Sequence, residues 1–118
     1  MRIPAILLTI ALALSCFGQT VGTDKKSLAR LDALQAKAKA AYQKRPKDGS
    51  IKKQYVEATV RYGTACMTSD DLDRKVKYRK ALRLYREALK VDPTNKEALN
   101  NKKLIESIYR SMGRPIPN

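Results

Sequence analysis

The sequence contains no histidine and no tryptophan, and it has one phenylalanine among its 118 residues. Histidine is the most frequent general base in enzymes and a common metal ligand, so its absence removes the usual side chain for both roles. The Ser, Thr and Cys residues are scattered, without a base at helical spacing from them. We therefore expect a protein that is not an enzyme and that carries no cofactor and no metal.

Acidic residues are scarce, and their densest cluster is Asp70, Asp71 and Asp73. As a calcium loop this cluster lacks the turn glycine and the distal bidentate glutamate, and Arg74 and Lys75 follow it directly. Aspartate is commonly enriched where a helix begins, because the N-terminal end of the helix dipole is positive. We interpret the cluster as a helix start.

Charged residues are almost absent from the first 23 positions, where Arg2 stands alone. Residues 3–14 are apolar apart from Thr9, and small and polar residues follow them. This order is typical of a secretory signal, and the apolar run is too short to span a membrane. Residues 1–22 are predicted to be a signal peptide cleaved after Gly18 or Gly22, with a retained membrane anchor as the alternative. We expect an exported protein, periplasmic or extracellular, of a bacterial cell envelope.

Cysteine occurs twice, as Cys16 and Cys66. Cys16 is a candidate for lipidation at the envelope, but Leu14 lies two residues before it, whereas a lipobox places leucine three residues before the cysteine. Cys16 is either removed with the signal peptide or lipidated, and in both cases it is not available to the folded domain. No intramolecular disulfide is therefore expected. Cys66 is then predicted to be a small buried apolar residue.

Positive charge is abundant, with 25 Lys and Arg against 11 Asp and Glu. Between Arg74 and Lys90 there are eight basic residues and one Glu. Spacings of three and four place five of them on one face of a helix, here called the basic stripe: Lys75, Arg79, Arg83, Arg86 and Lys90. The stripe is either a solvated face or a surface for anionic polymers, lipid head groups or nucleic acid. Nucleic acid is the least expected of these ligands, because an exported protein meets little of it in the periplasm or outside the cell.

No segment alternates with a period of two, so we expect no sheet and an all-α fold of four helices. The first helix ends at Lys44, before Arg45 and Pro46, and its apolar stripe comprises Leu28, Leu31, Leu34, Ala38, Ala41 and Tyr42. The second begins near Asp48, with Asp48 or Ser50 as its cap, and its stripe comprises Ile51, Tyr55, Ala58, Tyr62, Ala65 and Cys66.

A polar loop over residues 68–73 separates these helices from two more. The third helix is predicted from Arg74 or Tyr78 to Val91, and its stripe comprises Ala81, Leu82, Tyr85, Ala88 and Leu89. The fourth is predicted from about Asn95 to Met112, with Ala98, Ile105, Ile108 and Met112 on one side. Thr94 and Glu97 fit a capping box at its start, and Gly113 with Pro115 closes it.

The pattern Ala81-x3-Tyr85-x2-Ala88-x4-Pro93 resembles the second helix and the following turn of a tetratricopeptide repeat. Tyr62-Gly63 is similar to the large-residue-plus-glycine contact in the first helix of that family. A shift of 47 residues also places Pro46 on Pro93, Ala41 on Ala88 and Tyr62 on Tyr109, whereas the family's usual period is about 34 residues. We expect two degenerate tetratricopeptide-like units over residues 23–113 and a short tail over 114–118. A generic four-helix bundle is the alternative.

The resemblance implies a non-catalytic module that binds a protein or peptide partner, such as an adaptor or assembly factor. The implied groove lies on the first helix of each pair and is formed by Lys53, Glu57, Arg61, Thr64, Asn100, Lys103 and Ser107. Helical repeats usually need about three units for stability, so self-association or docking on a larger partner is expected for two. The alternative function is a basic-surface binder of an anionic polymer, membrane surface or nucleic acid. The six tyrosines are interpreted as packing residues rather than base-stacking platforms.

Overall fold

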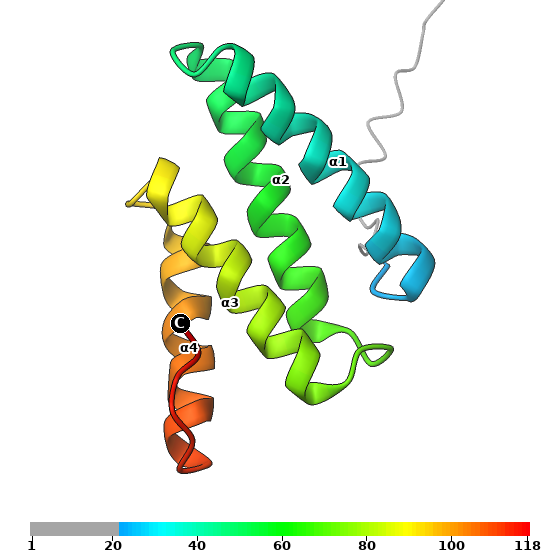
Figure 1. Cartoon of the computed structure of the whole chain (residues 1–118), viewed down its shortest axis with the longest axis vertical. Coiled ribbons are helices and arrows are strands. Elements are labelled where there is room, and N and C mark those ends of the chain that lie inside the picture. Colours follow the sequence, from blue (N-terminus) through cyan, green and yellow to red (C-terminus); the bar gives the residue numbers. More distant parts are fainter. Residues whose placement is uncertain (1–21) are drawn as a thin grey trace, which may run out of the picture.

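The computed structural model describes residues 22–118, which form four α-helices and no strand. The helices are α1 (Lys25–Lys44), α2 (Gly49–Thr68), α3 (Arg74–Val91) and α4 (Lys96–Ser111). Each helix runs antiparallel to the one before it (Figure 1). α2 packs against both α1 and α3, and α4 packs against α3 and more lightly against α2. The predicted all-α class, the four helices and the antiparallel neighbours are confirmed.

The predicted signal peptide lies almost wholly outside the described residues, which begin at Gly22. The predicted cleavage sites and the candidate lipidation of Cys16 therefore stay predictions. Within residues 22–118 no helix is both long enough and apolar enough to cross a membrane.

The starts of α1, α2 and α4 are held by side-chain caps that accept hydrogen bonds from free backbone N–H groups, whereas Asp73 at the start of α3 makes no such bond. Asp48, one of the two residues predicted to cap α2, is the cap. Its Oδ1 accepts from the backbone N of Ser50 at 3.0 Å and of Ile51 at 3.1 Å. The predicted capping box of α4 is wrong. Asn95 caps α4 by accepting from the backbone N of Ala98 at 3.0 Å, because the helix begins one residue later than a box with Thr94 requires.

The end of α4 follows the predicted glycine signal. Gly113 has a φ of 64°, in the left-handed region that glycine adopts without steric cost. The N–H of Gly113 donates to the carbonyl of Arg110, and the N–H of Arg114 donates to the carbonyl of Tyr109. These two bonds form a Schellman motif, which satisfies the last carbonyls of α4 and turns the chain back.

The core lies along α2 and α3, where small side chains let the helices approach. Tyr85, Ala81 and Ala98 are wholly buried. A Cβ built on Gly63 would lie 3.1 Å from Cε1 of Tyr85, so the tyrosine ring packs directly on the glycine backbone of α2. The sequence placed both residues at a helix contact, and the structure shows that they contact each other.

The packed face of α1 differs from the predicted stripe. Leu28 and Leu31 are buried, but Leu34 is 54% exposed, and Gln35 is buried in its place. The Gln35 amide donates to Oγ1 of Thr59 at 3.3 Å and to Oε2 of Glu87 at 3.2 Å. The expectation that Leu34 packs in the core is therefore wrong, because α1 turns its polar edge toward a hydrogen-bonded junction with α2 and α3. Met112, predicted on the packed side of α4, is likewise 41% exposed beyond the helix end.

Candidate functional site

The basic stripe lines a broad hollow in the molecule. Its volume is about 1830 Å³, and its walls come from α1, α3 and the C-terminal residues after α4. All five residues of the stripe line this hollow. Lys75, Arg79, Arg83 and Lys90 are exposed, and Arg86 is half-buried. The sequence predicted one basic face of a helix, and the structure shows that this face is one wall of a concave surface, here called the α1/α3 hollow.

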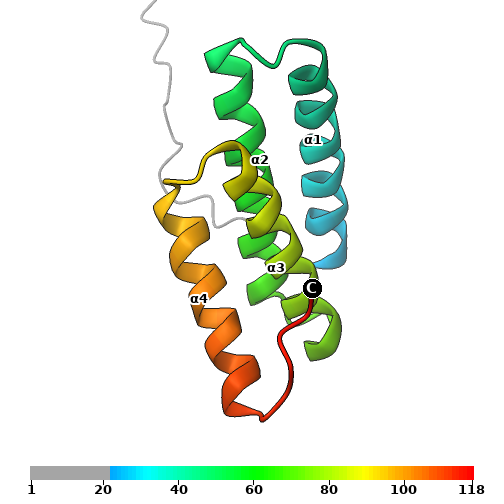
Figure 2. The ribbon, with the colours of Figure 1, turned by 60° about the vertical axis from the view of Figure 1, so that its left-hand side comes forward.

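The hollow exists because α1 and α3 both pack on α2 but keep their own backbones apart (Figures 1 and 2). Long side chains bridge the gap between the two helices at one point, Glu87 of α3. Nζ of Lys39 lies 2.7 Å from Oε1 of Glu87, and the Tyr55 hydroxyl donates to the same oxygen at 2.8 Å. Gln35 donates to the other carboxylate oxygen. Three helices are thus joined by one carboxylate.

The contacts around Glu87 also shift the pKa values of Glu87 and Tyr55. Burial opposes the ionisation of Glu87, but the hydrogen bonds from Lys39 and Tyr55 outweigh it, so the pKa of Glu87 lies below its ordinary value. Burial, together with the hydrogen bond to Glu87, raises the pKa of Tyr55. Glu87 is therefore ionised at neutral pH, and its charge is matched by Lys39.

The charges around the hollow are strongly unbalanced. Nine Lys and Arg side chains line it, against three side-chain carboxylates. Four cations join the basic stripe, and these are Lys39, Arg74, Lys80 and Arg114. The carboxylates belong to Asp32, Asp73 and Glu87, of which Glu87 already pairs with Lys39. None of the ion pairs between described residues uses a cation of the basic stripe.

The C-terminal residues form one side of the hollow. After the turn at Gly113, residues 114–118 run back beside α3 (Figure 2). Nη1 of Arg86 donates to the carbonyl oxygen of Pro117 at 2.7 Å, and the half-buried Ile116 packs against the core. The sequence predicted a short tail here but gave no signal that the tail docks, because the docking partner is 31 residues away along the chain.

The groove implied by the family resemblance is only partly assembled. Glu57, Arg61 and Thr64 line a smaller hollow of about 460 Å³ with residues from the start of α4. Lys53 is exposed and pairs weakly with Glu57 at 3.9 Å. Asn100, Lys103 and Ser107 are exposed on α4 and line neither hollow. The structure therefore brings three of the seven residues together in one hollow and leaves the other four outside it, and α4 packs mainly on α3.

The Thr64 side chain takes part in a hydrogen-bonded cluster that joins three helices. Its hydroxyl lies 2.8 Å from the Tyr85 hydroxyl and donates to Oε1 of Glu97 at 2.8 Å. Asn101 Nδ2 donates to the Tyr85 hydroxyl at 3.0 Å. Sequence reasoning missed Glu97 and Asn101, since no local pattern links them to a tyrosine on another helix. This cluster joins α2, α3 and α4 as the Glu87 junction joins α1, α2 and α3.

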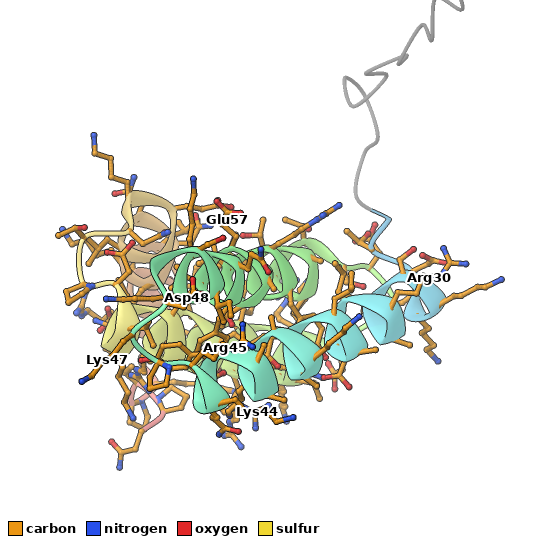
Figure 3. The ribbon with its side chains drawn as sticks, turned by 90° about the horizontal axis from the view of Figure 1, so that it is seen from above. Arg30, Lys44, Arg45, Lys47, Asp48 and Glu57 are labelled. Carbon is orange, nitrogen blue, oxygen red and sulfur yellow. The ribbon has the colours of Figure 1, made fainter. Side chains whose placement is uncertain are left out.

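Positive charge also occurs away from both hollows. Lys44, Arg45 and Lys47 lie around the turn between α1 and α2, and Arg30 lies toward the other end of α1 (Figure 3). These side chains are exposed and line neither hollow. They supply charge-matched positions for comparison with the α1/α3 hollow.

Cys66 is the one cysteine among residues 22–118, and it is wholly buried in α2 as predicted. Burial raises the pKa of its thiol, which opposes formation of the reactive thiolate. No group of three or more His, Cys, Asp or Glu side chains converges on a metal position within the described part of the chain. No protein-family model, no curated protein and no solved structure matches this chain.

Proposed function

We propose that the mature chain is a non-catalytic protein–protein interaction module, an adaptor or assembly factor exported to the cell envelope or exterior. The observation that carries this proposal is the α1/α3 hollow, which is open to solvent, lined by nine cations and already bordered by an extended stretch of polypeptide. A concave surface with convergent polar groups is the usual form of a binding site. Two partly buried polar junctions, at Glu87 and at Tyr85, hold the helices that form it.

The tetratricopeptide-like character of the helices is part of the same proposal. The close approach of Gly63 to Tyr85 and the burial of Ala81 and Ala88 support it. The proposed binding surface, however, lies between α1 and α3 rather than along α2 and α4, where the resemblance implied a groove. The docking proposal therefore moves from the implied groove to the α1/α3 hollow.

A non-catalytic role is supported by how the reactive side chains are used. The Cys66 thiol is buried, and Glu87 is bound by three side chains from α1 and α2. The chain has no histidine to serve as a base near neutral pH.

The test is capture of a partner followed by reconstitution. Tagged protein comprising residues 23–118 is mixed with envelope extract of the native cells, cross-linked, and the retained proteins are identified by mass spectrometry. We expect a protein that, once purified, binds the chain with a defined stoichiometry in isothermal titration calorimetry. Retention of lipid or polysaccharide alone, or of nothing, would contradict the proposal.

A second candidate function is binding of an anionic polymer or membrane surface, and the unpaired cations of the basic stripe favour it. Such binding releases counterions and therefore weakens steeply as salt rises. Co-sedimentation with vesicles that contain anionic lipid, and titration with a sulfated polysaccharide, test this function. Tight binding that is lost between about 50 mM and about 300 mM salt would favour it over the adaptor.

A further inference from the structure

We propose that the α1/α3 hollow binds an extended, acidic segment of a partner protein, with alternate acidic and apolar side chains. The acidic side chains would pair with the basic stripe, and the apolar side chains would contact the apolar residues that line the same hollow. This inference rests on the proposed function and names the chemistry of the partner at that site.

The charge of the hollow favours an anionic occupant over a neutral or cationic one. Its three carboxylates cannot neutralise nine cations, and the fold leaves the basic stripe without ion pairs among the described residues. Among the described residues, Arg86 is the one member of the stripe whose side chain has a hydrogen bond to the protein, and that bond goes to a main-chain carbonyl. Arg79 and Arg83 keep their guanidinium groups exposed, and a guanidinium pairs well with a carboxylate through two parallel hydrogen bonds.

The C-terminal residues show the kind of chain that this surface accommodates. They pass α3 without forming a helix, offer the Pro117 carbonyl to Arg86 and place Ile116 against the core. A peptide lying along the rest of α3 would use the same two contacts, a main-chain oxygen on an arginine and an apolar side chain on the helix. The exposed cations Lys75, Arg79 and Arg83 are available for it.

Apolar groups in the hollow favour a peptide over a polysaccharide or a lipid head group. Val76 is 50% exposed and Met112 is 41% exposed, and both line the hollow with Ile116 and the half-buried Tyr78. A sulfated sugar or a phosphate head group has few apolar atoms to cover these side chains. Successive side chains of a peptide strand point to opposite sides, so within a concave site one set can meet the cations of the α3 wall while the other set meets apolar residues elsewhere in the lining.

The length of the site follows from the helix. Lys75 and Lys90 are fifteen residues apart on α3, which corresponds to about 22 Å at about 1.5 Å per residue. An extended peptide covers this distance with about seven residues.

The test uses a fluorescein-labelled seven-residue peptide of alternating glutamate and leucine, measured by fluorescence anisotropy with the protein of residues 23–118. Two control peptides replace every glutamate by glutamine or every leucine by glycine. We expect each replacement to weaken binding by about tenfold or more, because each removes one of the two classes of contact. Equal binding of the glycine peptide would overturn the inference, since charge alone would then account for it.

Variants of the protein locate the site. Arg79→Glu with Arg83→Glu is expected to weaken peptide binding by about tenfold or more, because two attractions become repulsions. The matched control is Arg30→Glu with Lys47→Glu, which changes the net charge equally at exposed positions outside both hollows, and it should bind within about twofold of the wild type. Arg79→Gln with Arg83→Gln serves as a milder pair, and circular dichroism checks the fold of each protein. Equal losses in the hollow pair and the control pair would overturn the inference.

The captured envelope partner separates this inference from the proposed function. If the Arg79 and Arg83 variant loses the partner while the Arg30 and Lys47 variant retains it, both stand. If both variants retain the partner, the α1/α3 hollow is not its site, and the inference falls while the proposed function stands. If the wild type retains no protein but binds a sulfated polysaccharide or anionic vesicles, both fall.

Discussion

The contact between Gly63 and Tyr85 offers a direct test of how α2 and α3 pack. A methyl group added at Gly63 would lie 3.1 Å from Cε1 and 3.4 Å from Cδ1 of Tyr85, and 3.4 Å from Cβ of Leu84. Leu84 Cβ is fixed to the α3 backbone. The Tyr85 ring is wholly buried, and its hydroxyl is bound at 2.8 Å to Thr64 and at 3.0 Å to Asn101. A shift of Leu84 would displace the α3 backbone, and a shift of the Tyr85 ring would weaken the hydrogen bonds of its hydroxyl.

Two opposing effects decide the outcome of Gly63→Ala. Alanine in a helix interior is favoured over glycine by about 1 kcal/mol. Overpacking a filled core costs about 1–3 kcal/mol, and displacing the ring also weakens hydrogen bonds that contribute about 1 kcal/mol each. We therefore expect the free energy of unfolding to fall by about 1–2 kcal/mol despite the better helix propensity.

The assay is urea unfolding followed by circular dichroism at 222 nm, with the midpoint and slope fitted together. Gly49→Ala is the matched control, because a Cβ there meets nothing within 4 Å, and it should leave stability unchanged or slightly raised. In a Tyr85→Phe background the ring is released from its hydroxyl partners, so the cost of Gly63→Ala should shrink. A Gly63→Ala protein as stable as the wild type, or more stable, would refute the close packing of α2 on α3.

Three further predictions follow from other contacts. Glu87→Gln is expected to lower the free energy of unfolding by about 1–2 kcal/mol near neutral pH. Because the pKa of Glu87 is lowered in the folded state, the stabilisation by its carboxylate is lost as the pH falls through that pKa. Urea titrations from about pH 6 to about pH 3 should therefore show the stabilities of the wild type and the variant converging. Asp48→Ala should cost about 1 kcal/mol in the same assay, and Asp73→Ala, at a helix start without a side-chain cap bond, distinctly less. Leu31→Ala should cost about 2–4 kcal/mol, whereas Leu34→Ala should stay within about 0.5 kcal/mol, and equal costs would contradict the observed face of α1.

The helices themselves could be predicted from local patterns. The predicted end of α1 at Lys44, the loop over residues 68–73 and the glycine turn after α4 agree with the structure. Each depends on neighbouring residues: a proline that cannot continue a helix, a run without apolar periodicity, and a glycine that adopts positive φ. The capping box at Thr94 was wrong because two adjacent residues, Thr94 and Asn95, can both cap, and the helix start selects one.

Which face of each helix is buried was less predictable. Leu34 fits the apolar stripe of α1 as well as Leu31 does, yet it is exposed, because the buried Gln35 turns α1 toward Glu87 of α3. That carboxylate is 52 residues from Gln35 in the sequence, and no periodicity reveals the pair. The residues of the implied groove do not line one hollow for a similar reason, since α4 packs on α3 at an orientation that its own sequence does not specify.

The sequence alone determined the number of helices, the ends of α1 and α4 and the excess of positive charge, because each follows from residue type and local spacing. It also placed the basic stripe on one face of α3. Only the tertiary structure decided that this stripe lines a hollow with α1 and the C-terminal residues. The physical reason is that the hollow depends on polar contacts at Glu87 and Arg86 between residues far apart in the chain, and such contacts form only after the helices have packed.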